Sequence, residues 1–166
     1  MKKLLIILIV FLITQDLLGQ KKISSVDFGN GIILNTQVEP FNAGQHKYDT
    51  CDMGQEWKTI CLIDGKIWFG TDQGLDIPRN QLTKMTIKIS GKEVGLDVSG
   101  MYNPSFTGQL TKNQFKLKSI GEEYTLYGYF SDGAGTYTAH WTVIKGKSIR
   151  QIITKDERAF YWQLEK

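Results

Sequence analysis

The chain has 166 residues, a formal net charge of +3 at pH 7, and 41% hydrophobic against 22% charged residues. This length suits one domain, and lysines scattered between acidic residues argue against a nucleic-acid-binding surface, which needs a clustered basic face. Its 17 glycines and 3 prolines, without sustained helical periodicity after residue 20, are typical of an all-β domain rich in turns.

Residues 1–19 have the parts of a cleavable signal peptide. A short basic start precedes an apolar run over residues 4–13, and the small Gly19 stands where a signal peptidase would cut. A transmembrane anchor is the alternative, but it needs roughly 20 apolar residues, and this run ends at Thr14. We therefore expect an exported domain of residues 20–166, periplasmic or secreted, with no integral membrane span after cleavage.

The chain has two cysteines, Cys51 and Cys61. In an oxidising compartment an even pair of cysteines predicts a disulfide. Closing a ring of about 11 residues would stabilise the fold by roughly 2.5–3 kcal/mol. The alternatives are two buried thiols or a metal-binding pair, although this spacing is not common among metal ligands.

Alternating polar and apolar residues mark most of the remaining chain as half-buried β-strands. The first hairpin is expected over residues 57–69, because Asp64-Gly65 between two apolar runs is typical of a two-residue turn. The second hairpin is expected over residues 83–98, with its turn at residues 90–92. Further strands are expected at residues 115–118, 124–130, 136–143, 148–154 and 160–164.

Hairpins that follow one another along the chain predict an antiparallel meander of about nine strands. A meander with one apolar face has to bury that face. We therefore expect either a β-sandwich or a flattened β-barrel, and the sequence leaves both open.

The loop before the strand at residues 136–143 is the first candidate for a binding surface. Ser131 and Asp132 are followed by Gly133 and Gly135, and glycines at this spacing let backbone amides point at a common anion or carbonyl. Tyr137 would add a stacking face. The alternative is a hairpin loop that needs the glycines for its own dihedral angles.

Two long connections, residues 70–80 and 99–108, are further candidates, because long loops on a rigid scaffold often carry function. Tyr102 lies on the second connection, and Tyr129 falls on the predicted polar face of its strand. Exposed tyrosines are good contact residues for a protein or glycan partner. The alternative is a sheet that is covered on both faces.

Catalytic and metal-binding patterns are weak. Ser131, Asp132 and His140 are the residue types of a nucleophile triad, but Ser131 lacks the Gly-x-Ser-x-Gly elbow and His140 lies in the middle of a predicted strand. Asp72 and Asp76 are the best candidates for calcium ligands, without the pattern of a known calcium loop. The sequence therefore predicts no catalytic residue, no metal site and no cofactor.

One short stretch resembles a known family. The pattern that runs from Gly133 through Tyr137 and Trp141 to Lys145-Gly146 loosely resembles the loop-then-strand pattern of small periplasmic lysozyme-inhibitor barrels. The Ser-Gly segment characteristic of those inhibitors is not matched. The resemblance implies an inhibitor-like binding role.

The sequence favours an exported, non-enzymatic binding module of the bacterial envelope or exterior that recognises a protein or glycan partner. An inhibitor or immunity protein would be one version. A small secreted hydrolase is the first alternative, with the loop carboxylates of Asp72, Asp76 and Asp132 brought next to His140 by folding. A structural envelope protein that self-associates through a strand edge is the second. The oligomeric state stays open.

Overall fold

The computed structural model describes residues 20–163, apart from residues 53, 55–57, 73 and 132. The predicted signal peptide lies outside the described residues. Ten strands are described: β1 (Lys22–Gly29), β2 (Ile32–Pro40), β3 (Tyr48–Asp52), β4 (Lys58–Ile63), β5 (Asn80–Ile89), β6 (Lys92–Gly95), β7 (Phe115–Ile120), β8 (Glu123–Phe130), β9 (Tyr137–Ile144) and β10 (Lys147–Thr154). Three short 3-10 helices accompany them: η1 (Ala43–Gln45), η2 (Lys112–Gln114) and η3 (Glu157–Gln163).

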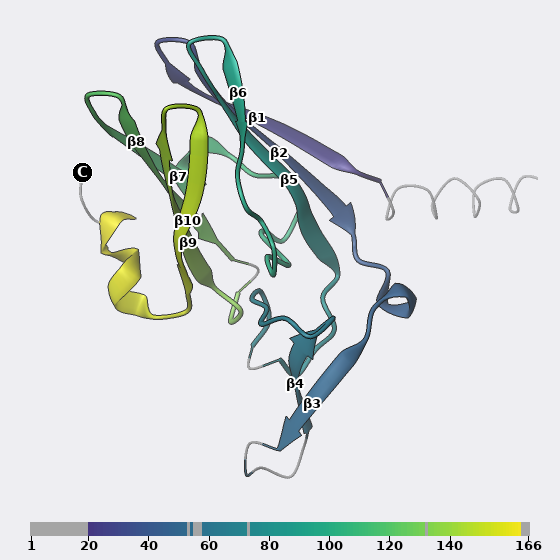
Figure 1. The fold of residues 1–166 in the computed structure, drawn as a ribbon. Coiled ribbons are helices and arrows are strands. Elements are labelled where there is room, and N and C mark those ends of the chain that lie inside the picture. The colour runs from purple at the N-terminus through teal and green to yellow at the C-terminus, as the bar shows by residue number, and fades with distance from the viewer. Residues whose placement is uncertain (1–19, 53, 55–57, 73, 132, 164–166) are drawn as a thin grey trace, which may run out of the picture.

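The strands form two four-stranded antiparallel sheets, ordered β1-β2-β5-β6 and β10-β9-β8-β7, and a separate β3-β4 hairpin. The two larger sheets face each other across one apolar core (Figure 1). Leu34 and Ile87 come from the first sheet, and Leu126, Phe130 and Trp141 come from the second. The predicted all-β class is confirmed, and the fold is an open β-sandwich, because the described strands do not close into a barrel.

Positive φ angles shape the tight turns that join neighbouring strands. A non-glycine residue followed by glycine, both with positive φ, forms three of these turns: Asn30-Gly31, Ser90-Gly91 and Lys145-Gly146. Two positive φ values in succession give the turn whose twist matches that of antiparallel strands. These three turns lie at the same end of the sandwich, which we call the turn end (Figure 1). Their shape follows directly from the local sequence.

The Asp64-Gly65 turn forms as predicted, with φ angles of 52° and 71°. The prediction that this turn joins two strands of a hairpin over residues 57–69 was wrong. Strand β4 pairs with the preceding strand β3, and across the turn the described residues form an isolated bridge between Ile63 and Lys66. The chain after the turn instead pairs with a distant loop. The Phe69 backbone N–H donates to the Gly100 carbonyl at 2.9 Å.

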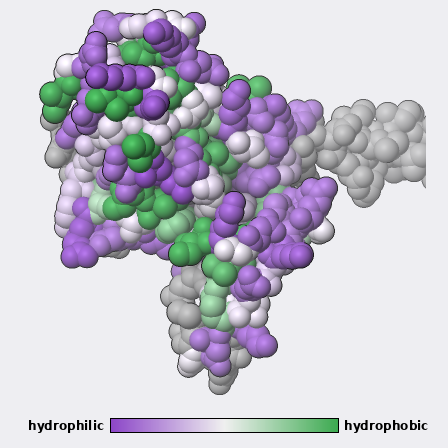
Figure 2. Space-filling model, in the orientation of Figure 1, coloured by the Kyte–Doolittle hydropathy of each residue, from purple (hydrophilic) through white to green (hydrophobic). Residues whose placement is uncertain are grey.

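The Cys51–Cys61 disulfide is confirmed and links β3 to β4, with a Cα–Cα distance of 5.8 Å. The β3-β4 hairpin projects from the sandwich and stands out below its body in the space-filling view (Figures 1 and 2). Of the described residues, none from this hairpin belongs to the main apolar core. The disulfide therefore braces a projection that the core does not hold.

The strand expected at residues 160–164 was wrong, because the chain forms the helix η3 up to Gln163, and residue 164 lies outside the described residues. The Asp156 carboxylate accepts a hydrogen bond from the Arg158 backbone N–H at 3.0 Å, which starts the helical turn as an N-cap does. Trp162 then lies against Tyr127, with ring centroids 5.7 Å apart. Helix η3 therefore covers part of the outer face of the β10-β9-β8-β7 sheet.

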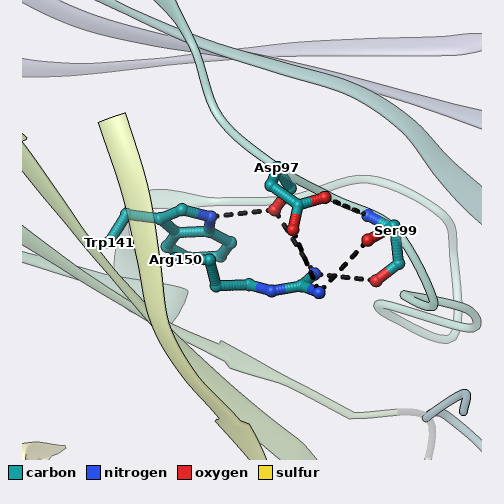
Figure 3. Close-up of polar contacts among 4 residues, drawn as sticks. All are labelled: Asp97, Ser99, Trp141 and Arg150. Carbon is teal, nitrogen blue, oxygen red and sulfur yellow. Dashed lines mark hydrogen bonds and ion pairs between the residues drawn. The ribbon is translucent and has the colours of Figure 1, made fainter. Parts of the chain in front are cut away.

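Polar contacts join the two sheets along one side of the sandwich (Figure 3). Arg150 of β10 donates to the Ser99 carbonyl at 2.7 Å and lies 3.1 Å from the Asp97 carboxylate. The indole N–H of Trp141 donates to the Asp97 carbonyl at 2.8 Å. These contacts connect the edge strand β10 and its neighbour to the segment that follows β6.

Candidate functional site

Three connections that are far apart in the sequence meet at the end of the sandwich opposite the turn end. The loop end, as we call it, comprises the described residues of the ranges 70–80, 99–108 and 131–136, that is, without residues 73 and 132. An isolated bridge pairs Ser105 with Ser131. A Cβ atom on Gly135 would lie 2.5 Å from the Gly70 backbone, so only glycine permits this approach.

Asn103 ties two of these connections together. Its side chain is almost completely buried, with 2% of its surface exposed. Its amide donates to the Gly70 carbonyl at 3.0 Å, and its oxygen accepts from the backbone N–H groups of Arg79 at 2.9 Å and Asn80 at 3.2 Å. Sequence reasoning missed this residue, although an Asn-Pro pair within a long loop is a signal for a fixed turn.

A pocket of about 450 Å³ opens where the loops meet. Its lining combines carboxylates, one guanidinium, a buried amide and small residues: Thr71, Asp72, Asp76, Ile77, Arg79, Asn103, Ala134 and Gly135. Apolar side chains are exposed on the same loops, among them Leu75, Ile77 and Phe106, which is 70% exposed. The loop end therefore presents a polar pocket beside exposed apolar side chains.

A lysine from beyond β10 lies next to this pocket. Lys155 donates from its ammonium group to the Thr71 carbonyl at 2.8 Å. Burial lowers the pKa of Lys155, and the nearby charge of Asp72 acts in the opposite direction. The Thr71 hydroxyl is buried and has no hydrogen-bond partner among the described residues, so the wall of the pocket retains an unused polar group.

The structure places the residues of the predicted 131–137 loop in different environments. The Ser131 hydroxyl is 2.6 Å from the Thr136 hydroxyl and accepts from the Gly133 backbone N–H at 3.1 Å. These bonds lie within the loop, which favours a turn that uses its polar groups to fix its own shape. Asp132 lies outside the described residues.

Tyr137 does not supply an exposed stacking face. It is fully buried, its ring stacks on Phe130 with centroids 5.2 Å apart, and its hydroxyl donates to the Tyr102 carbonyl at 2.9 Å. The prediction that Tyr137 is a contact residue therefore has to be corrected, because alternation along β9 turns this ring into the core. Tyr137 instead supports the loop end from the core, through its hydrogen bond to the Tyr102 carbonyl.

The other two predicted tyrosines are half-buried. The Tyr102 ring packs edge-on against Phe41 and Trp68, at centroid distances of 5.2 Å and 5.8 Å. Tyr129 packs edge-on against Phe160 of η3, with ring centroids 5.6 Å apart. Both rings pack within the chain, and the exposed apolar side chains of the loop end include Leu75, Ile77 and Phe106 instead.

Of the described side chains that the hydrolase alternative requires, His140 does not line the pocket that holds Asp72 and Asp76, and Asp132 lies outside the described residues. His140 lies on the outer face of β9, where its ring is 4.6 Å from that of Tyr127, whereas Asp72 and Asp76 line the pocket at the loop end. Among the described residues, no cluster of three or more His, Cys, Asp or Glu side chains is placed to hold a metal ion. Asp72 and Asp76 therefore form a pair of carboxylates without a third ligand of these types in the described chain.

Comparison with known protein families gave no match, and comparisons with curated proteins and with solved structures gave none either. Within the described part of the chain, no helix combines the length and the apolar character that a membrane crossing requires. The chemistry of the loop end therefore has to be derived from its own residues.

Proposed function

We propose that this protein is an exported, non-enzymatic binding module that recognises a protein partner through its loop end. The observation that carries the proposal is the convergence of three separate loops around one pocket, with exposed apolar side chains on the same loops. Protein interfaces combine apolar anchor residues with polar groups that are arranged around them.

Contacts among described residues hold these loops together without a partner. Asn103 holds the 70–80 and 99–108 connections together, and Gly135 packs directly on the backbone at Gly70. A surface that is already ordered loses little conformational entropy on association, which favours tight binding. Rigid loops therefore support recognition of one defined shape.

The pocket suits a hydrogen-bond donor from the partner. Asp72 and Asp76 are exposed carboxylates on its wall, and both accept hydrogen bonds when ionised. A lysine or arginine side chain could enter between them while Ile77 and Phe106 contact apolar groups around it. Arg79 and Lys155 balance part of the negative charge, so the fit depends on geometry as well as on charge.

Export of this module is supported by two features of the chain. The Cys51–Cys61 disulfide is consistent with an oxidising environment. Residues 1–19 carry the sequence pattern of a signal peptide. Both features are expected for a protein that works in the periplasm or outside the cell.

A crosslinked pull-down from envelope and medium fractions tests the proposal. The tagged protein should enrich one protein, and the Phe106→Ser and Asp76→Asn variants should lose it. Lys118→Gln, an exposed change on the outer face of β7, is the control and should retain it. Equal recovery by all variants would exclude the loop end, and enrichment of glycans instead of a protein would assign the surface to carbohydrate recognition.

Self-association is a second candidate, because the outer face of the β10-β9-β8-β7 sheet keeps exposed isoleucines. Ile120, Ile144 and Ile149 are exposed there, and Figure 2 shows hydrophobic residues at the surface over this sheet. Light scattering on the purified protein should then show an oligomer that Ile149→Ser dissociates. A monomer at high concentration would remove this candidate.

A further inference from the structure

A second cleft lies at the turn end of the sandwich, at the opposite ends of β8 and β9 from the loop end. It has a volume of about 410 Å³ and opens between the two large sheets. Residues from the β5-β6 hairpin form one wall, and residues next to the β7-β8 and β9-β10 turns form the other. The volume lies within the range of clefts that hold small organic ligands, roughly 300–1,000 Å³.

The inner part of this cleft is apolar. Val94 and Val143 are buried, one from each sheet, and both belong to the main core. Ile89 and Tyr124 are half-buried at the neighbouring strand ends and also line the cleft. The core therefore extends to the cleft without a polar layer between them.

The mouth of the cleft is charged. Lys92 shares a strand face with Val94, because alternate residues of a strand point to the same side, so its side chain starts on the inner face of β6. Lys145 comes from the β9-β10 turn, and both lysines are exposed. Glu122 is the acidic residue that lines the cleft, so positive charge exceeds negative charge there.

We propose that this cleft binds a single-chain amphiphile with an anionic head group, such as a fatty acid. The apolar tail would lie between the sheets against Val94 and Val143. The carboxylate would lie at the mouth between Lys92 and Lys145, whose long aliphatic stems can cover the tail while their ammonium groups stay in water. The positive excess selects an anion over a cation of the same length.

Calorimetric titration with dodecanoate tests this site, with dodecyltrimethylammonium as the cationic probe of equal chain length. Dodecanoate should bind saturably below its micellar concentration and more tightly than the cation. In methyl NMR spectra, its shifts should centre on Val94 and Val143. Added salt should weaken dodecanoate binding, because salt screens the attraction between the carboxylate and the lysines.

Two variants remove the charges without disturbing the core. Lys92→Gln changes an exposed strand residue, and Lys145→Asn keeps a residue that tolerates the positive φ of 49° at this turn. Each change should weaken dodecanoate binding about two- to five-fold, and both together about tenfold. Lys147→Gln, an exposed change in the same hairpin outside the cleft, should leave binding unchanged.

Three results would overturn the proposal. The first is equal affinity for the anionic and cationic probes, and the second is equal binding by the Lys92→Gln and Lys147→Gln variants. The third is a set of NMR shifts centred on Ile149, which is 62% exposed on the outer face of the sheet. Shifts at Ile149 would show non-specific adhesion to an apolar surface. None of the three results depends on whether the loop end binds a partner.

Discussion

The buried side chain of Asn103 makes three hydrogen bonds that a side chain of another shape cannot reproduce. Its backbone has a positive φ of 41°, a conformation that asparagine adopts more readily than most residues. Asn103→Ala would leave one carbonyl and two N–H groups without this partner. Because each unsatisfied buried group costs about 1–3 kcal/mol, we expect the free energy of unfolding to fall by at least about 2 kcal/mol.

Denaturant unfolding measures this change, and partner binding should weaken with it because the loop end loses its fixed shape. Asn113→Ala is the control, since Asn113 is exposed and should tolerate truncation. A loss of stability equal to that of the control would show that the loops are held by other contacts.

The burial of His140 predicts a dependence of stability on pH. Burial lowers the pKa of His140 below its ordinary value, and the backbone of Ala159 offsets part of this shift. The unfolded chain therefore binds the proton at a higher pH than the folded chain. Stability is complete above the ordinary pKa of about 6.5 and falls as the pH drops through it.

Urea unfolding at about pH 8 and about pH 5 measures this effect. The His140→Phe variant, which keeps an aromatic ring against Tyr127, should lose part of the difference between the two pH values. An identical pH dependence in the variant and the parent protein would contradict the assignment to His140.

At the scale of elements, helix η3 fixes the environment of His140 as well as covering the sheet. Trp162 is buried against Tyr127, and its indole N–H donates to the Thr138 hydroxyl at 3.3 Å. Trp162→Ala should lower the free energy of unfolding by about 3 kcal/mol. It should also raise the pKa of His140 towards its ordinary value, because water reaches the ring.

Thermal unfolding and NMR titration of His140 measure the two effects together. Tyr161→Ala is the matched control on the same helix, since Tyr161 is largely exposed. If Trp162→Ala destabilises the protein but leaves the His140 titration unchanged, η3 does not cause the burial.

The β3-β4 hairpin should respond to reduction on its own. Its disulfide closes a short ring, and removing it should make opening of the hairpin easier by about 2–3 kcal/mol. The Ile60 backbone N–H donates to the Gly74 carbonyl at 3.0 Å, so a looser hairpin would also loosen the 70–80 connection.

Hydrogen exchange before and after reduction measures this opening. The Ile60 amide should exchange at least about tenfold faster after reduction, while the Leu126 amide in the core should not change. Partner binding should weaken in parallel. Equal acceleration at both amides would mean that the disulfide supports the whole fold.

These elements also show which parts of the fold were predictable. The hairpin at Ser90-Gly91 was predicted because its signal is local: a turn that requires two positive φ angles. The segment at Lys66–Phe69 was misassigned because its partner lies in the 99–108 connection, which no local pattern reveals. Helix η3 was taken for a strand because its apolar residues are too few for their spacing to distinguish a helix from a strand.

At the scale of the whole molecule, the sandwich separates its two candidate sites by the length of β8 and β9. Alternation predicted a meander with one apolar face to bury, but the choice between sandwich and barrel depends on whether edge strands pair, which is decided by tertiary packing. Tertiary packing also limited the prediction of the loop end. Its loops were predicted as candidates, but their convergence through Asn103 depends on contacts between residues far apart in the chain.

The described edge strands of the two large sheets do not pair with each other, and side chains join the sheets instead. Arg150 makes the main contacts of this kind on one side. Its side chain is 15% exposed and bridges Ser99 and the Asp97 carboxylate, which is 51% exposed, whereas the 2.6 Å pair between Arg158 and Asp156 joins side chains that are 83% and 40% exposed. Burial decides the energetic value of these contacts more than distance, because water competes with an exposed pair.

Arg150→Ala should therefore lower the free energy of unfolding by about 2 kcal/mol, since it removes charge-assisted hydrogen bonds from a largely buried group. Arg150→Lys should recover only part of the loss, because an ammonium group lacks the fork that reaches Ser99 and Asp97 together. Arg158→Ala should cause no measurable change, although it breaks the shorter contact. If denaturant unfolding gave similar losses for the Arg150 and Arg158 variants, the sheets would be held together by the apolar core alone and this side contact would contribute nothing.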